Sequence, residues 1–254
     1  MNVSENNRRI ARNTLLLYGR KAVTMLIALY SSRVLLQYLG IDDFGLYGLI
    51  GSIIAVFTSL KSTFAASVQR FLNVNKEESI ARKNEIFCMG MIIHVLIAVV
   101  FILLAEIGGA ILLPNLNLNT EKLIVAGCIL RFTILSAAVS IITVPFDALA
   151  MANEKFDALA VISIIDSVLR LCVIFILSFS PIQRVVFYAI LLLCVTIVHI
   201  LMIGGYCYKT FKDTVKFHFV MDRVLFKRMT SFAGWNFFGN LGYYLTSEGV
   251  NFIP

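Results

Sequence analysis

The sequence predicts an all-α integral membrane protein with six complete transmembrane helices and a seventh at its C-terminal end. Hydrophobic residues make up 59% of the 254-residue chain and charged residues only 15%. The mean hydropathy is +0.86, well above that of soluble domains. The apolar residues form runs of about 20 or more, the length that crosses a bilayer as a helix. Lysines and arginines, finally, gather in alternate connections between these runs.

Short polar connections separate the apolar runs. Strands of a membrane barrel would show alternation over about 10 residues, so the continuous runs predict helices. The six complete spans are residues 14–39, 45–74, 86–113, 123–150, 157–179 and 185–207.

The predicted domain organisation has three parts. Residues 1–208 form a six-helix transmembrane lobe, residues 209–228 form a basic amphipathic connector, and residues 229–254 begin a seventh helix. Within the connector, "VKFHFVMDRVLFKR" alternates basic and apolar residues, which predicts an interfacial helix. No polar flank follows Pro254. We therefore expect the chain to be the first part of a longer protein.

The loop charges predict the orientation in the membrane. Two basic residues, Lys122 and Arg184, lie on the side opposite to the N-terminus. Thirteen lie on the side of the N-terminus: Arg8, Arg9, Arg12, Lys76, Arg82, Lys83, Lys155, Lys209, Lys212, Lys216, Arg223, Lys227 and Arg228. Cytoplasmic loops carry such an excess, so the N-terminus is predicted to be cytoplasmic and the protein to lie in the cell membrane. The net charge of +7 is then a signal of topology and of attraction to membrane lipids, and nucleic acid is excluded as a partner.

Basic residues also outnumber acids inside the spans. Apart from Asp157 at the first position of the fifth span, the acids of the six complete spans are Glu106, Asp147 and Asp166. The bases are Arg20, Lys21, Arg33, Lys61, Arg70, Arg131 and Arg170. A charge at the centre of a transmembrane helix costs about 2.5 to 3.5 kcal/mol on insertion scales, so each needs a reason. Arg70 and Asp147 lie near predicted cytoplasmic ends, where long side chains can reach the interface.

Lys61 and Arg131 lie deeper. Lys61 stands in "SLKSTFAASVQRFL" without an acid three or four residues away, among small residues that line wet cavities or permit close helix packing. Arg131 precedes the similar stretch "FTILSAAVS". We interpret both as facing an aqueous cavity, with pairing to an acid on another helix as the open alternative.

The resulting hypothesis is a cationic cavity that binds an anion. Its candidate residues are Lys61, Arg131, Arg170, Arg20 and Arg33. Arginine grips phosphate or pyrophosphate with two hydrogen bonds, so such a cavity favours a phosphorylated cargo over a cationic one. Asp166 and Arg170 are four residues apart and can pair on one helix face. They are predicted either to form a structural ion pair or to belong to the wet site.

No enzyme signature competes with this interpretation. The sequence contains no glycine-rich phosphate loop, paired catalytic carboxylates or Ser-His-Asp arrangement, and no metal or cofactor site is predicted. His94 and His199 are single residues on apolar helices. They are predicted to make buried polar contacts.

Several stretches together resemble the O-antigen type polysaccharide flippases of the multidrug/oligosaccharidyl-lipid/polysaccharide exporter superfamily. They are "RVLLQYLGIDDFGLYGLIGSIIAVF", "SVQRFLNV", "TVPFDALAMANEKFDALAVISIIDSVLRL" and "GWNFFGNLG". The resemblance covers essentially the whole chain and matches the N-terminal half of the family. It implies two six-helix lobes around a central cavity, with the second lobe absent from this chain.

That resemblance further implies a function. Such transporters flip a polyprenyl-pyrophosphate-linked oligosaccharide across the cytoplasmic membrane for surface polysaccharide synthesis, and the anionic lipid-linked glycan suits the basic excess. Two alternatives stay open. One is a multidrug or cation antiporter of the same superfamily, which the scarcity of intramembrane acids disfavours. The other is a membrane assembly component without transport activity, in which the charges form internal salt bridges.

Overall fold

A computed structural model describes the backbone of residues 3–116, 118–220 and 222–249. Within this backbone, the side chains of residues 3–6, 9, 10, 53, 55–63 and 237–249 lie outside the described part. The described elements are all helical, which confirms the predicted all-α fold class. They are α1 (Val3–Val74), α2 (Ile80–Leu112), η1 (Leu113–Asn115), α3 (Thr120–Ile142), α4 (Val144–Ala152), α5 (Phe156–Ile176), η2 (Leu177–Phe179), α6 (Arg184–Thr210), α7 (Lys212–Val215) and α8 (Arg223–Gly249).

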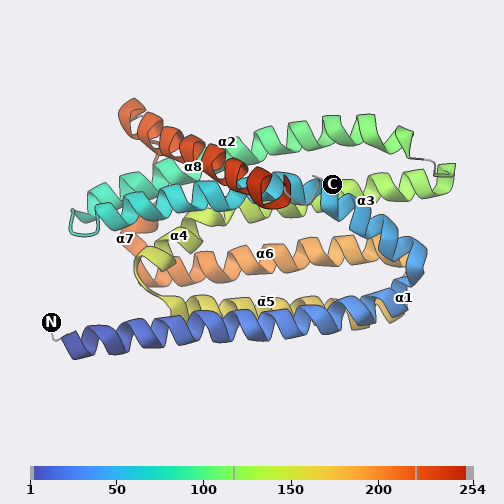
Figure 1. The fold of residues 1–254 in the computed structure, drawn as a ribbon, viewed down its shortest axis with the longest axis horizontal. Helices are drawn as coiled ribbons and strands as arrows, with labels where there is room; N and C mark the ends of the chain where they lie inside the picture. Colours follow the sequence, from blue (N-terminus) through green and yellow to red (C-terminus); the bar gives the residue numbers. More distant parts are fainter. Residues whose placement is uncertain (1–2, 117, 221, 250–254) are drawn as a thin grey trace.

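Helix α1 has two arms that meet at Gly40. This glycine has φ 79° and ψ 172°, a non-helical conformation that only glycine adopts without steric cost. Figure 1 shows the chain turning back at this point, so that the first arm runs beside α5 and the second returns across the bundle. Near the kink, Asp42 forms an ion pair with Lys122 of α3 at 2.8 Å. The first two predicted spans therefore correspond to the two arms of one kinked helix.

The predicted fourth span is broken into α3 and α4. Pro145 stands in the first turn of α4, where its missing N–H costs nothing. The hydroxyl of Thr143 donates to the carbonyl of Val139 at 2.9 Å. The break lets α4 pack against both the second arm of α1 and α6.

The connector differs from its prediction. Residues 216–220 are not helical, and α8 begins at Arg223, so the expected interfacial helix over "VKFHFVMDRVLFKR" is wrong for its first part. The physical reason is a set of contacts that hold the backbone extended against α2. The side-chain amide of Asn84 donates to the carbonyls of Thr214 and Lys216 at 2.7 and 2.8 Å.

Five helical stretches of the described residues are long and apolar enough to cross a membrane. They are Ala11–Ser52, Ile80–Asn115, Thr120–Ala152, Phe156–Phe179 and Arg184–Thr210. The second predicted span contains positions 53 and 55–63, whose side chains lie outside the described part. The count of six complete spans and a seventh therefore stays a prediction.

Buried apolar residues form a core that continues along the bundle. At one end, Val68, Phe87, Leu149 and Met229 join the second arm of α1 to α2, α4 and α8. Leucines such as Leu15, Leu26 and Leu201 remain more than half exposed on the outside. Exposed apolar side chains in such numbers would be a liability in water, but they suit a surface that faces lipid.

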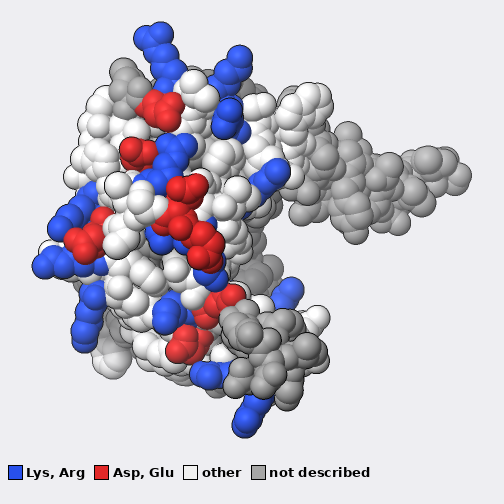
Figure 2. Space-filling view, turned by 90° about the vertical axis from the view of Figure 1, so that its left-hand side faces the viewer, with Lys and Arg blue, Asp and Glu red and all other residues white. Residues whose placement is uncertain are grey.

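Charged side chains gather at one end of the bundle. This is the end where the first arm of α1 begins, where α1 connects to α2, and where α7 lies (Figure 1). Figure 2 looks onto it and shows basic and acidic side chains interspersed. Among them, Lys76 pairs with Glu154 at 3.6 Å and Lys216 with Asp213 at 2.8 Å. A polar end on an otherwise apolar bundle marks a membrane–water interface.

Candidate functional site

A cavity of about 360 Å³ opens between both arms of α1, α5 and α6. The first arm lines this cavity with the small polar side chains of Thr24, Ser31 and Ser32. Tyr47 and Tyr188 close another wall with their rings 5.1 Å apart in an edge-to-face arrangement. This gives the cavity hydroxyl groups on one side and aromatic surface on the other.

Arg170 is the charged residue of this cavity. Its Nε donates to Oδ2 of Asp166 at 2.8 Å, one helical turn earlier on α5. The Arg170 side chain is 43% exposed, whereas that of Asp166 is only 16% exposed. The carboxylate of Asp166 therefore binds Nε of Arg170 from the buried side. The rest of the guanidinium group stays accessible from the cavity.

His199 of α6 completes this cluster. Its Nδ1 lies 3.5 Å from Oδ1 of Asp166. Both of these atoms are buried, and within the described part of the chain neither has a hydrogen-bond partner. A small rotation of the imidazole would close the contact. Asp166 is thus placed to hold Arg170 and His199 from two different helices.

Arg170 and Asp166 are the predicted site residues that the structure brings together. Arg20 is partly buried on the first arm of α1, while Arg33 and Arg131 are exposed on α1 and α3. None of these three is among the residues that line the described cavity around Arg170. Lys61 lies outside the described side chains. A shared role of all five in one cationic cavity stays a prediction.

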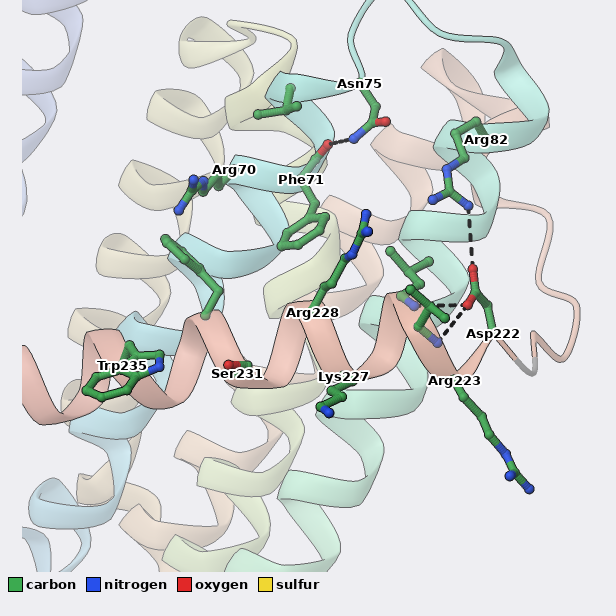
Figure 3. Close-up of a pocket in the computed structure, with 14 residues that line it drawn as sticks. Arg70, Phe71, Asn75, Arg82, Asp222, Arg223, Lys227, Arg228, Ser231 and Trp235 are labelled. Atoms are coloured by element: carbon green, nitrogen blue, oxygen red, sulfur yellow. Dashed lines mark hydrogen bonds and ion pairs between the residues drawn. The ribbon is translucent and has the colours of Figure 1, made fainter.

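A second concavity, of about 940 Å³, lies at the charged end of the bundle. We call it the basic groove and define it by Arg70 and Phe71 at the end of α1, Arg82 at the start of α2, and Asp222, Arg228, Phe232 and Trp235 along α8. Figure 3 shows that the labelled residues of this set come from α1, from α2 and from the segment that includes the start of α8. Sequence reasoning missed this groove, because it treated Arg70 as an interfacial side chain and Arg228 as a loop charge.

Asp222 is the one acid among the described residues that line the groove, and it caps a helix. Oδ1 of Asp222 accepts the backbone N–H groups of Val224 and Leu225 at 2.9 Å each, and so caps the start of α8. These bonds, the Leu225 N–H first, lower the pKa of Asp222 against the opposing effect of burial, and Arg82 adds to the decrease. Asp222 therefore stays ionised at neutral pH as a cap rather than as a free acid.

Comparison with known proteins identifies the family of the chain. The family model described as "Polysaccharide biosynthesis protein" matches residues 10–252. No curated protein matches the sequence.

Three solved structures share the fold. A MATE protein in complex with MaD3S is 14% identical, with a TM-score of 0.78 over 96% of this chain and 56% of the solved one. An outward-facing multidrug resistance MATE transporter of the MOP superfamily is 14% identical, with a TM-score of 0.72 over 95% and 55%. A MOP superfamily transporter from Pyrococcus furiosus is 15% identical, with a TM-score of 0.69 over 94% and 55%. The chain thus spans about half the length of these transporters.

Proposed function

The chain belongs to the polysaccharide biosynthesis protein family and has the fold of one lobe of a MOP superfamily transporter, and we propose that it acts in a flippase. The proposed cargo is a polyprenyl-pyrophosphate-linked oligosaccharide, carried across the cytoplasmic membrane for surface polysaccharide synthesis. The observation that carries this proposal is the accessible guanidinium group of Arg170 in a cavity lined by hydroxyl groups. A guanidinium group can bind a pyrophosphate with paired hydrogen bonds.

The charge balance of the spans supports an anionic cargo over a cationic drug. The six predicted spans contain seven basic residues and, apart from Asp157 at the first position of the fifth span, three acids, of which Asp166 is already engaged by Arg170. A site for a cationic drug would need a free carboxylate. The solved transporter from Pyrococcus furiosus carries the description "reverse polarity of binding pocket suggests different function". For this chain too, we use the polarity of the pocket to distinguish an anionic cargo from a cationic drug.

We further propose the three-part organisation, with a lobe over residues 1–208, a connector over 209–228 and the start of a second lobe over 229–254. In this arrangement the charged end of the bundle faces the cytoplasm. A cysteine at position 79 should then resist labelling from outside the cell, and a cysteine at position 117 should be labelled. The opposite pattern would reverse the orientation.

The flippase proposal is tested by glycan display on cells that produce variants of the chain at matched membrane levels. Lys61→Glu should reduce display most, because it repels the anionic cargo. Arg170→Gln should also lose display, whereas Lys61→Arg keeps the charge and should retain part of it. Lys209→Gln, at the exposed end of α6, is the matched control and should display glycan normally.

A complementary assay follows the lipid carrier. Loss of the chain should leave the lipid-linked glycan in the cytoplasmic leaflet, where added enzymes reach it only after cell lysis. If Lys61→Glu and Arg170→Gln both display glycan as well as the parent, neither residue faces the cargo. The proposed flippase mechanism would then be wrong.

A further inference from the structure

The basic groove is built from rigidly docked elements. The buried hydroxyl of Ser67 donates to the carbonyl of Met229 at 2.8 Å and ties the second arm of α1 to α8. Leu225 and Met229 are almost fully buried beneath the groove. The groove side chains of α8 therefore face α1 and α2 from a fixed position.

Two guanidinium groups of the groove are not neutralised by acids. Arg82 is shared between Glu85 at 2.7 Å and Asp222 at 3.8 Å. Arg70 and Arg228, in contrast, have no carboxylate within ion-pair distance among the residues that the structure describes. Figure 3 shows Arg228 pointing from α8 toward Phe71, Asn75 and Arg82, while Arg223 extends away from them. Arg70 and Arg228 therefore contribute charge that a ligand can use, and Lys227 and Arg223 also line this concavity.

Aromatic side chains continue the groove along α8. The guanidinium carbon of Arg70 lies 4.1 Å from the ring centroid of Phe232, a cation–π distance. Trp235 follows Arg228 by seven residues, which puts it about 10 Å further along the same helix face. Its side chain is 77% exposed. The arginines lie at the end of the bundle, and the exposed Trp235 lies further along α8. A lipid has the same order, with its phosphate at the membrane surface and its acyl chain below.

We propose that the basic groove binds the phosphate group of an anionic glycerophospholipid, with the glycerol and upper acyl chain against Phe232 and Trp235. Phe232 and the exposed Trp235 supply apolar surface beside the cations, which is why a glycerophospholipid at the membrane surface is favoured as the occupant. The site is separate from the cavity around Arg170. It requires only that the charged end lies at a membrane surface.

Trp235 provides a direct test, because it is the single tryptophan of the chain. The chain is reconstituted into phosphatidylcholine vesicles that contain phosphatidylglycerol or phosphatidylcholine with brominated acyl chains, which quench nearby tryptophan. Brominated phosphatidylglycerol should quench Trp235 more strongly at equal mole fraction, and the quenching should saturate. Equal quenching by the two lipids would overturn the proposal.

Charge variants separate a site from general attraction to an anionic surface. Arg70→Gln with Arg228→Gln removes the charge-assisted hydrogen bonds proposed to hold the phosphate, and each such bond lost should weaken binding by about tenfold or more. Lys209→Gln with Lys212→Gln removes the same charge from the neighbouring connector and should change it little. An equal loss in both pairs would overturn the proposal. Arg70→Lys with Arg228→Lys keeps the charge and should retain binding, which guards against misfolding of the first pair.

Competition identifies the source of the phosphate. Inorganic phosphate at constant ionic strength should not displace brominated phosphatidylglycerol, and displacement would show that the groove does not need a lipid. A polyprenyl pyrophosphate at 1 mol% (about one lipid in a hundred) should also leave the quenching unchanged. Full displacement would assign the groove to the cargo and overturn the phospholipid proposal. None of these readouts depends on transport, so the flippase proposal stands or falls separately.

Discussion

The cavity around Arg170 and the basic groove both contain arginines, but different groups lie beside the arginine charge in the two regions. In the cavity, Asp166 holds Arg170 at 2.8 Å on the same helix and is itself only 16% exposed. In the groove, Asp222 is used to cap α8, and Arg70 is supported by the ring of Phe232 instead. Arg170 is 43% exposed, so it keeps an accessible guanidinium group although its partner carboxylate is largely buried. The position of each arginine in the fold thus determines how its charge is compensated.

The largest expected effect is at the ion pair of Asp166 and Arg170. Asp166→Ala should leave Arg170 without its carboxylate and destabilise the fold by about 2 to 3 kcal/mol, below the value for a fully buried pair because Arg170 is 43% exposed. The loss should appear as a lower melting temperature in detergent and a lower membrane level.

The double variant Asp166→Ala with Arg170→Met is the control for this prediction. It removes both charges and should recover much of the lost stability. Normal stability of Asp166→Ala alone would mean that Arg170 is hydrated like the groove arginines, and the contrast between the two regions would fail.

A medium effect is expected from the packing beneath the groove. A methyl group added at Gly90 would lie 3.3 Å from both γ-carbons of Val68, two residues before Arg70. Valine is stiff at χ1, so Gly90→Ala should push the second arm of α1 and cost about 1 to 2 kcal/mol. It should also weaken the response of Trp235 to anionic lipid.

Gly108→Ala is the matched substitution in the same helix, because a methyl group there meets nothing within 4 Å. It should leave the melting temperature unchanged or raise it, since alanine favours helix more than glycine does. Equal melting temperatures of the two variants would show that the packing under the groove is adaptable.

The smallest effect is expected at Asp222. Its pKa is lowered in the folded state, so its stabilising contribution is present above the unfolded pKa and is lost as pH falls through the folded pKa. Asp222→Asn keeps an oxygen that can cap α8 but cannot titrate. It should flatten the decrease in melting temperature on acidification. Glu77→Gln, an exposed carboxyl in the α1–α2 connection, should leave that decrease as it is.

The sequence predicted individual helices better than their joints. Long apolar runs identify membrane helices because every backbone polar group must be satisfied within the segment in lipid. The break at Thr143 and the extended residues 216–220 were not predicted. The first has a local cause in Pro145, which lacks the backbone N–H needed to continue α3 and does not interrupt the apolar run. The second depends on Asn84, which is more than 100 residues away, and such a long-range contact leaves no periodic signal.

The features of the two sites also depend partly on residues close in the chain and partly on tertiary structure. The sequence by itself determined the all-α membrane fold, the basic excess of the spans and the pairing distance of Asp166 and Arg170, because each depends on residues close in the chain. Only the tertiary structure placed His199 against Asp166 and brought Arg70, Arg82 and Arg228 into one groove. Those residues come from different helices, and their separation is set by helix packing rather than by sequence spacing.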